Sequence, residues 1–159
     1  MSTGTYDSRN ETVKHIKRVE RLLADVRLQL HDRGIHHDES KLGKDEKPTF
    51  DCMTEKLRTL TYGSDEYKAA LAQMQTALDH HYRNNRHHPE HFANGVDDMT
   101  LVDVVEMLCD WKAASERHAD GCIVRSIKLN QERFQFCPQL AKMLLNTARS
   151  LGWAAAETE

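Results

Sequence analysis

The residues best suited to chemistry lie in one short stretch, His36-His37-Asp38-Glu39-Ser40-Lys41. Asp38 offers hard carboxylate oxygens and His37 a neutral imidazole nitrogen, a mixture that suits Mn, Fe, Co or Zn better than Ca. Adjacent side chains do not share a helix face, so a doublet that binds one ion must lie at a helix end or in a distorted turn. Lys41 follows on the same face as Asp38 and can reach a phosphate oxygen. The stretch therefore indicates either a site for a cation and a phosphate or a hydrophilic helix start with Asp38 as N-cap.

A second group of polar residues is the histidine-rich run at positions 80–92, HHYRNNRHHPEHF. It follows a helix expected from about Asp65 toward Asn85, which Ser64 can cap and whose apolar face consists of Ala70, Leu71, Met74, Ala77 and Leu78. At about 100° per residue, this inward stripe continues through His81, Asn85 and, if the helix lasts that far, His88. The helical phase directs His80, Asn84 and His87 to another side.

Pro89 disfavours helical geometry at His88, so either the last turn of this helix or a bend after it supplies His88. A solvated, histidine-rich tip is one interpretation of the run. Polar residues that extend a buried stripe favour the other interpretation, which is a functional site.

Carboxylates also line the helix expected from about Leu101 to Arg117, which Thr100 and Asp103 can cap. This helix is apolar nearly all round, as is typical of a helix through the middle of a domain. Its one polar stripe consists of Asp103, Glu106, Asp110 and Arg117. On an outer helix the stripe would face solvent, whereas on a central helix the carboxylates must be paired or must bind a metal.

The first long helix, expected from about Asn10 to Arg33, carries one histidine on its apolar stripe. His15 falls in line with Val19, Leu22, Val26 and Leu30 at helical spacing, which predicts that it is buried. It is either a core histidine with satisfied hydrogen bonds or a metal ligand.

The remaining segments complete an all-α pattern. Residues 42–48 are expected to form a loop, and Tyr62-Gly63 and residues 119–122 to form turns. The segments 50–60 and 138–151 are expected to be helices, and the segment 123–135 a helix or a loop followed by a helix. No strand-like alternation of useful length occurs. The sequence predicts a single domain over residues 1–159, a bundle of about six helices with loose termini at 1–9 and 152–159.

Composition narrows the classes of protein. The 159 residues are 39% hydrophobic and 30% charged with a net charge of -3, which is typical of a soluble globular protein and does not favour nucleic acid as a stable partner. Four widely spaced cysteines, without a CxxC pair, suggest reduced core thiols: Cys52, Cys109, Cys122 and Cys137. Neither a leader nor a membrane-spanning apolar run is recognised, so we expect a cytoplasmic protein without a membrane partner.

In order along the chain, these residues resemble the HD-domain superfamily of metal-dependent phosphohydrolases. His15, the doublet His37-Asp38 with Lys41, and Asp110 match its H, HD and D positions, and HDESK looks like the HDxxK variant of the doublet. The likeness spans roughly residues 12 to 117. It implies an HD-type helical fold and a divalent metal ion, one of Mn, Co, Fe, Zn or Mg, held by His15, His37, Asp38 and Asp110.

A closer likeness involves a family of small, mostly uncharacterised phage and bacterial proteins. The segments HHYRNNRHHPEHF and VEMLCDWKAASER look like its signatures, and this likeness reaches through Asn146. For a phage-encoded member, the expected location is the host cytoplasm. HHPE also looks like the histidine pair that some HD members use for a second metal, but the spacing from His81 to His88 is far shorter than in those members.

The resemblance implies hydrolysis of a phosphate ester, and we expect a nucleotide substrate, a (deoxy)nucleoside mono- or triphosphate. Lys41, with Arg83, Arg86 or Lys112, would offset the charge that develops on phosphate. Glu39, Glu106 or a nearby histidine would move the proton. The substrate contacts are predicted to be Lys41, His81, Asn85, His88, Lys112 and Arg117.

Two other classes of function stay open. One is a nucleotide-binding or sensing module that keeps the metal centre without turnover. The other is a di-iron, oxygen-activating enzyme of HD-type fold. The sequence leaves the number of metal ions open, as it does the oligomeric state, for which a homodimer is one option.

Overall fold

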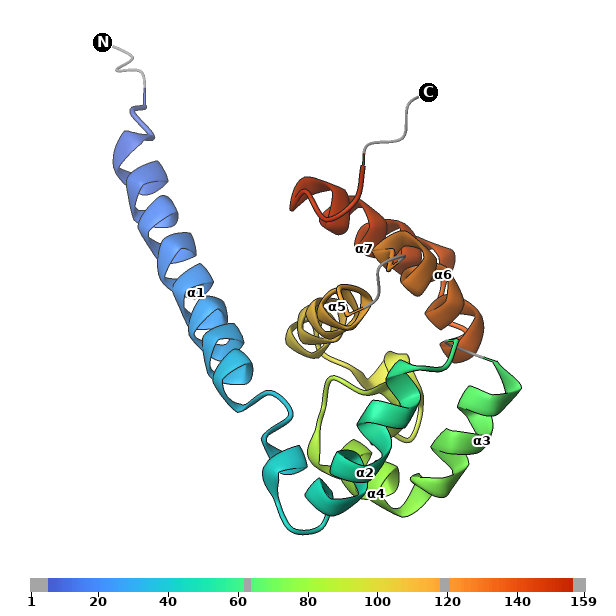
Figure 1. Cartoon of the computed structure of the whole chain (residues 1–159). Coiled ribbons are helices and arrows are strands. Elements are labelled where there is room, and N and C mark those ends of the chain that lie inside the picture. The colour runs from blue at the N-terminus through green and yellow to red at the C-terminus, as the bar shows by residue number, and fades with distance from the viewer. Residues whose placement is uncertain (1–5, 62–63, 118–120, 156–159) are drawn as a thin grey trace, which may run out of the picture. The chain divides into compact units, whose positions relative to one another are not determined.

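A computed structural model of the chain describes residues 6–61, 64–117 and 121–155 (Figure 1). Helices and turns make up this part of the chain, and it contains no strand, which confirms the predicted all-α class. The chain divides into two compact units, residues 1–35 and residues 36–159. The turn expected at Tyr62-Gly63, half of the turn expected at residues 119–122, and residues 1–5 and 156–159 of the two expected loose termini lie outside the described residues.

The first unit consists of the helix α1, which runs over Arg9–His36 into the start of the second unit. It continues past Gly34, where we expected it to stop, because one glycine in a helix costs only about 1 kcal/mol. None of its residues is buried, and Val19, Leu22 and Val26 are 38%, 45% and 47% exposed. A lone helix offers its stripe no neighbour within the unit, so the predicted burial of the stripe with His15 stays a prediction.

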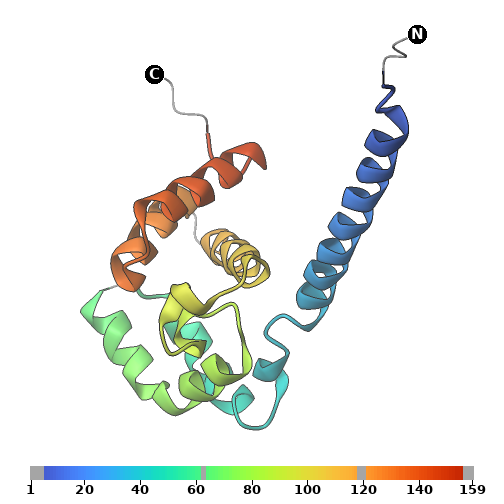
Figure 2. The ribbon, with the colours of Figure 1, turned by 180° about the vertical axis from the view of Figure 1, so that it is seen from behind.

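The second unit contains the remaining helices, which Figures 1 and 2 show from opposite sides. Its 3₁₀-helices are η1 (Glu39–Leu42), η2 (Pro89–His91) and η3 (Gly95–Asp98). Its α-helices are α2 (Lys47–Arg58), α3 (Asp65–Gln73), α4 (Gln75–Asn84), α5 (Leu101–Ser115), α6 (Ile123–Phe134) and α7 (Pro138–Ser150).

One predicted helix is divided in two. The segment expected to run from Asp65 toward Asn85 is interrupted at Met74, where φ is -96° and ψ is 2°. The described part of the chain therefore has seven α-helices rather than about six. Both predicted N-caps are confirmed: Ser64 accepts a hydrogen bond from the amide of Tyr67, and Thr100 with Asp103 forms a capping box.

The larger apolar core of this unit lies among α5, α6 and α7. It contains the fully buried side chains of Met107 and Ile127 and the nearly buried Leu144. Trp153 and Ala154 also pack against it, although we expected residues 152–159 to form a loose tail. This core fixes the position of α5, from which Glu106 and Asp110 reach the candidate site.

A smaller apolar cluster joins α2 and α3. Met53, Ala70 and Met74 are buried in it, and Leu71 and Leu78 pack against it in part. Ala77 and His81 are also buried, so the inward stripe predicted for this segment is confirmed and does reach His81.

The four cysteines correct one prediction. Cys52, Cys109, Cys122 and Cys137 are free but exposed, not core thiols. The reason at Cys109 is that α5 has an open face, on which Leu101 and Val105 are also exposed.

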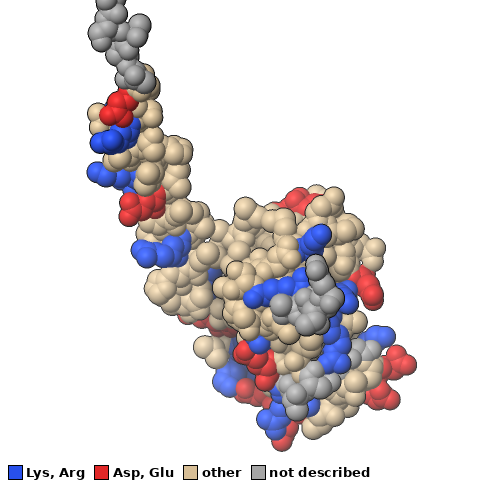
Figure 3. All heavy atoms as spheres, turned by 90° about the horizontal axis from the view of Figure 1, so that it is seen from above, with Lys and Arg blue, Asp and Glu red and all other residues tan. Residues whose placement is uncertain are grey.

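The distribution of charged side chains on the surface is consistent with the small net charge. Basic and acidic side chains both occur on the face of the second unit that Figure 3 shows. Among the described residues, no helix is long and apolar enough to cross a membrane.

Candidate metal centre

The His37-Asp38 doublet lies in the turn between α1 and η1. Asp38 adopts a left-handed backbone conformation, with φ 58° and ψ 14°, which aspartate tolerates better than most residues. The prediction of a helix end or distorted turn is thus confirmed. The Asp38 side chain makes no capping hydrogen bond, so the N-cap interpretation fails.

Several imidazole Nε2 atoms converge on the Asp38 carboxylate. Oδ1 lies 3.2 Å from Nε2 of His81 and 3.5 Å from Nε2 of His87, while Oδ2 lies 3.6 Å from Nε2 of His37. Nε2 of His81 is also 3.0 Å from Nε2 of His88. Asp38 Oδ1 and His87 Nε2 are buried without a hydrogen-bond partner among the described residues. Buried polar atoms in this state need an explanation, and a bound ion would supply one.

These side chains form two overlapping groups with the geometry of metal ligands. Asp38, His81, His87 and His88 make the first group, and His37, His87 and Asp110 the second; within each, the ligand atoms lie within 4.8 Å of one another. Imidazole nitrogen mixed with carboxylate oxygen suits Mn, Fe, Co or Zn. The residues present therefore fit a transition-metal ion. We call these six residues the His–Asp cluster.

Glu106 lies behind two histidines of the cluster. Its Oε1 atom is 3.0 Å from Nδ1 of His37 and 3.1 Å from Nδ1 of His87. At His37 this contact is a hydrogen bond, which suits an imidazole that carries the proton on Nδ1 and directs Nε2 toward Asp38. Nδ1 of His87 is buried without a hydrogen-bond partner among the described residues. The carboxylate predicted to move a proton is thus placed to orient His37.

The inward position of His87 corrects the helical-phase prediction. The helix α4 ends at Asn84, and Asn85 is extended, with φ -126° and ψ 106°, so the phase of α4 does not apply to His87. His87 is 1% exposed, and its ring lies between the rings of His37 and His88, at 4.3 and 4.2 Å. Pro89 was the sequence signal that the helix ends early.

An ion pair holds this loop in place. Arg86 donates hydrogen bonds from Nε and a terminal nitrogen to the two carboxylate oxygens of Asp103, at 3.1 and 3.0 Å. Asp103 is fully buried and belongs to the capping box of α5. The loop that carries His87 and His88 is therefore tied to the start of α5.

The residues in and around the cluster shift one another's pKa values. Hydrogen bonds to Asp110 and Glu106 raise the pKa of His37 to about 10. Burial acts to raise the pKa of Asp38, but its contacts with His81 and Lys41 hold it below the usual range. Burial, and then the neighbouring His87 and His81, lower the pKa of His88 to about 3. His88 is thus neutral and ready to bind a metal, whereas His37 must first lose a proton.

Two of the predicted substrate contacts also lie at the cluster. Nζ of Lys41 is 2.5 Å from Oδ2 of Asp38. Asn85 is buried, and its side-chain amide donates to Ser40 Oγ at 2.7 Å. His81 and His88, also predicted as substrate contacts, are grouped with the metal ligands instead.

The other predicted residues lie elsewhere. Glu39 is exposed at the start of η1, and Arg117 is exposed beyond the end of α5. Nζ of Lys112 pairs with Glu116 at 2.9 Å. His15 belongs to the first unit, and its role as a ligand stays a prediction.

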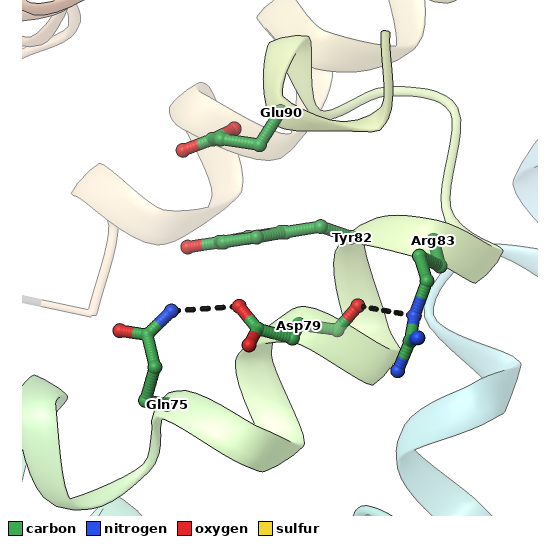
Figure 4. A pocket seen from close by; sticks show the side chains of 5 residues that line it. All are labelled: Gln75, Asp79, Tyr82, Arg83 and Glu90. Atoms are coloured by element: carbon green, nitrogen blue, oxygen red, sulfur yellow. Dashed lines mark hydrogen bonds between the residues drawn. The ribbon is translucent and has the colours of Figure 1, made fainter. Parts of the chain in front are cut away.

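A surface pocket of about 440 Å³ lies beside Tyr82, whose ring centroid is 4.9 Å from that of His88. Figure 4 shows the Tyr82 ring between the side chains of Asp79 and Glu90, with Gln75 and Arg83 completing the lining. Arg83 donates from Nε to the backbone oxygen of Asp79. With two carboxylates and one arginine, the pocket suits hydroxyl or amino groups better than phosphate.

Fold and site together define an all-α protein with a buried cluster of histidine and aspartate that can hold a metal ion. Residues 4–150 match a family described as a family of unknown function (DUF5662), and the chain belongs to that family. No curated protein and no solved structure matches the chain. The likeness to the HD superfamily therefore stays a resemblance.

Proposed function

We propose that the chain is a metal-dependent phosphohydrolase that acts on a nucleotide, a (deoxy)nucleoside mono- or triphosphate. The observation that carries this proposal is the buried pair of Asp38 Oδ1 and His87 Nε2, which lie 3.5 Å apart and lack hydrogen-bond partners among the described residues. Further imidazole nitrogens surround this pair, and Lys41 lies beside it. Such a site combines cation ligands with a group that can bind phosphate.

The His–Asp cluster would hold the divalent ion. An ion bound there would polarise a phosphoryl oxygen and lower the pKa of a water molecule. Lys41 would stabilise the charge that develops on phosphate. We assign Glu106, whose Oε1 atom lies 3.0 Å from Nδ1 of His37, to the orientation of that imidazole. A histidine of the cluster, or Glu106 itself, would move the proton.

A metal-supplemented activity screen tests the proposal. The wild-type protein would be incubated with Mn, Co, Fe, Zn or Mg and with nucleotides and cyclic nucleotides, and phosphate and nucleoside products would both be measured. Phosphate release with at least one metal is the expected result. Metal binding without any product would favour a nucleotide-binding module instead.

A substitution at Lys41 distinguishes a contribution to catalysis from a contribution to metal binding in the same assay. Lys41→Ala should keep the metal, since a cation is a poor ligand, and should lose on the order of 2–4 kcal/mol of transition-state stabilisation, about a hundredfold or more in turnover. Arg117→Ala is the matched control for removal of a cation, because Arg117 is exposed outside the cluster. Unchanged turnover in Lys41→Ala would contradict the assigned role.

One observation supports a second candidate function. The two oxygens of Asp38 lie near different histidines, and the two ligand groups overlap at His87, as in a site for two metals. A di-iron, oxygen-activating enzyme would use such a site. Two Fe per chain, together with oxygen consumption and without phosphate release, would favour it.

A further inference from the structure

Glu46 is a buried carboxylate outside the His–Asp cluster. It is 0% exposed at the start of α2, where it makes no side-chain capping hydrogen bond, while Asp45 and Lys47 on either side are exposed. Glutamate is almost never fully buried unless it is paired, because removing a charge from water is costly. Its partners therefore indicate why it is there.

Both partners of Glu46 are histidines from the end of α4. Oε1 lies 2.7 Å from Nδ1 of His80, and Oε2 lies 2.9 Å from Nδ1 of His81. His80 is partly exposed and His81 is buried, so the carboxylate links an outer ring to an inner one. The carboxylate thus offers one acceptor oxygen to each of the two rings.

The opposite nitrogen of His81 faces the cluster. Nε2 is 3.2 Å from Asp38 Oδ1 and 3.0 Å from His88 Nε2. A histidine binds a metal through the nitrogen that carries no proton, and the partner of its other nitrogen decides which one that is. Glu46 at 2.9 Å from Nδ1 is nearer to the ring than Asp38 at 3.2 Å from Nε2, and so favours the tautomer that carries the proton on Nδ1 and keeps the Nε2 lone pair for an ion shared with Asp38.

We propose that Glu46 is a positioning residue, which fixes the tautomer and ring direction of His81 so that its Nε2 atom can bind the metal ion. His80 holds the second oxygen of Glu46 from the solvent side and is not itself a ligand. This inference rests on the proposed metal centre. It gives a role to Glu46, which lies in the loop between η1 and α2, and to His80, which the helical phase directs away from the site.

The requirement for a carboxylate follows from its two equivalent acceptors. Each oxygen of Glu46 faces an Nδ1 atom and can accept a hydrogen bond from it, whereas glutamine has one acceptor and one donor. In Glu46→Gln, the amide donor must face one of the two rings, and at His81 it would favour the wrong tautomer. Loss of such an orienting carboxylate typically weakens metal binding by about 10–100-fold.

The test combines metal titration with a direct reading of the tautomer. Co²⁺ or Mn²⁺ would be titrated against the full chain by competition with a chelator. Glu46→Gln should raise Kd about 10–100-fold. Asp45→Asn is the matched control: it removes the neighbouring negative charge, 3.8 Å from His80 Nε2, and should leave Kd within about twofold. Equal weakening in both variants would overturn the inference and indicate a general effect of charge.

Long-range ¹H–¹⁵N NMR of the metal-free protein reads the proton on His81 directly. The wild-type protein should carry it on Nδ1, and Glu46→Gln should shift His81 toward the Nε2-protonated form. A wild-type His81 protonated on Nε2 would overturn the inference even if the variant did not fold. Lack of metal binding by the wild-type protein would contradict the proposed function, whereas the tautomer measurement decides the inference about Glu46 separately.

Discussion

His87 belongs to both ligand groups of the His–Asp cluster, whereas His88 and Asp110 belong to one each. Its ring is buried between those of His37 and His88. No other residue of the two groups has this shared position, so loss of His87 removes a ligand from both.

We predict that His87→Ala lowers bound metal more than His88→Ala or Asp110→Ala does. Metal content after dialysis, measured by elemental analysis, checks the order. His36→Ala is the control, because His36 is exposed and lies outside both groups. A full complement of metal in His87→Ala would mean that its buried ring only fills space.

The protonation of His37 leads to a second prediction at the level of single residues. Because its pKa is about 10 without metal, it is protonated at pH 8 and must lose a proton before it can bind an ion. Metal binding at pH 8 should therefore release about one proton per ion, and less in His37→Gln. Calorimetry in buffers of different ionisation enthalpy measures this release. Equal proton release by the two proteins would contradict the assignment of His37.

At the scale of elements, the link between the loop after α4 and the start of α5 depends on Asp103. This buried carboxylate receives two hydrogen bonds from Arg86 and caps α5 through Thr100. We predict that Asp103→Asn lowers the free energy of unfolding by about 2–3 kcal/mol, since it weakens both a cap and a charged pair whose arginine can still reach water. Urea unfolding measures the change, and a loss below about 0.5 kcal/mol would contradict it.

The effect of Asp103 should also depend on pH. Burial acts to raise its pKa, but hydrogen bonds from Arg86 and Thr100 lower it to about 2, below the value of about 3.9 in the unfolded chain. Its contribution is complete above about pH 4 and is lost as the pH falls toward 2. The difference in unfolding free energy between wild type and Asp103→Asn should shrink from pH 5 to pH 2. A difference that stays constant would contradict this account.

Local sequence signals predicted most elements and part of the site. Helical periodicity located the helices, and the caps at Ser64 and Thr100 were visible as residue types. The same periodicity placed Glu106 and Asp110 on one polar stripe of α5 and left open whether the stripe faces solvent or the interior; the structure directs both residues toward His37.

Two residues could not be found in this way. His87 was missed because its direction depends on an extended residue after α4, and helical phase carries no information beyond a helix end. Glu46 was missed because it lies in a charged segment that resembles a solvated loop. Its burial depends on His80 and His81, far along the sequence, and periodicity does not report such long-range pairs.

Within the second unit, the His–Asp cluster brings together segments that do not all meet in either of the unit's two apolar cores. One core joins α5, α6 and α7, and the other joins α2 and α3. The ligands come from the turn before η1, from α4, from the loop after α4 and from α5. A bound ion therefore ties together parts of the unit that share little apolar contact.

We predict that metal raises the thermal stability of the protein. An ion at a hundred times its Kd adds about 2.7 kcal/mol if it binds only the folded state, which corresponds to about 5–10 °C in Tm for a chain of this size. Calorimetric melting with metal and with a chelator measures the shift. Lys41→Ala should keep the shift and Asp38→Ala should lose it; a shift of equal size in Asp38→Ala would place the ion elsewhere.

The central claim is that Asp38 and the imidazoles around it bind a transition-metal ion, and equilibrium dialysis followed by elemental analysis tests it most directly. After exposure to Mn, Fe, Co and Zn, the wild-type protein and His36→Ala should retain at least one ion per chain. Asp38→Ala should retain none, although it keeps its helical content by circular dichroism. A wild-type protein without bound metal, or a folded Asp38→Ala protein with a full complement, would contradict the account.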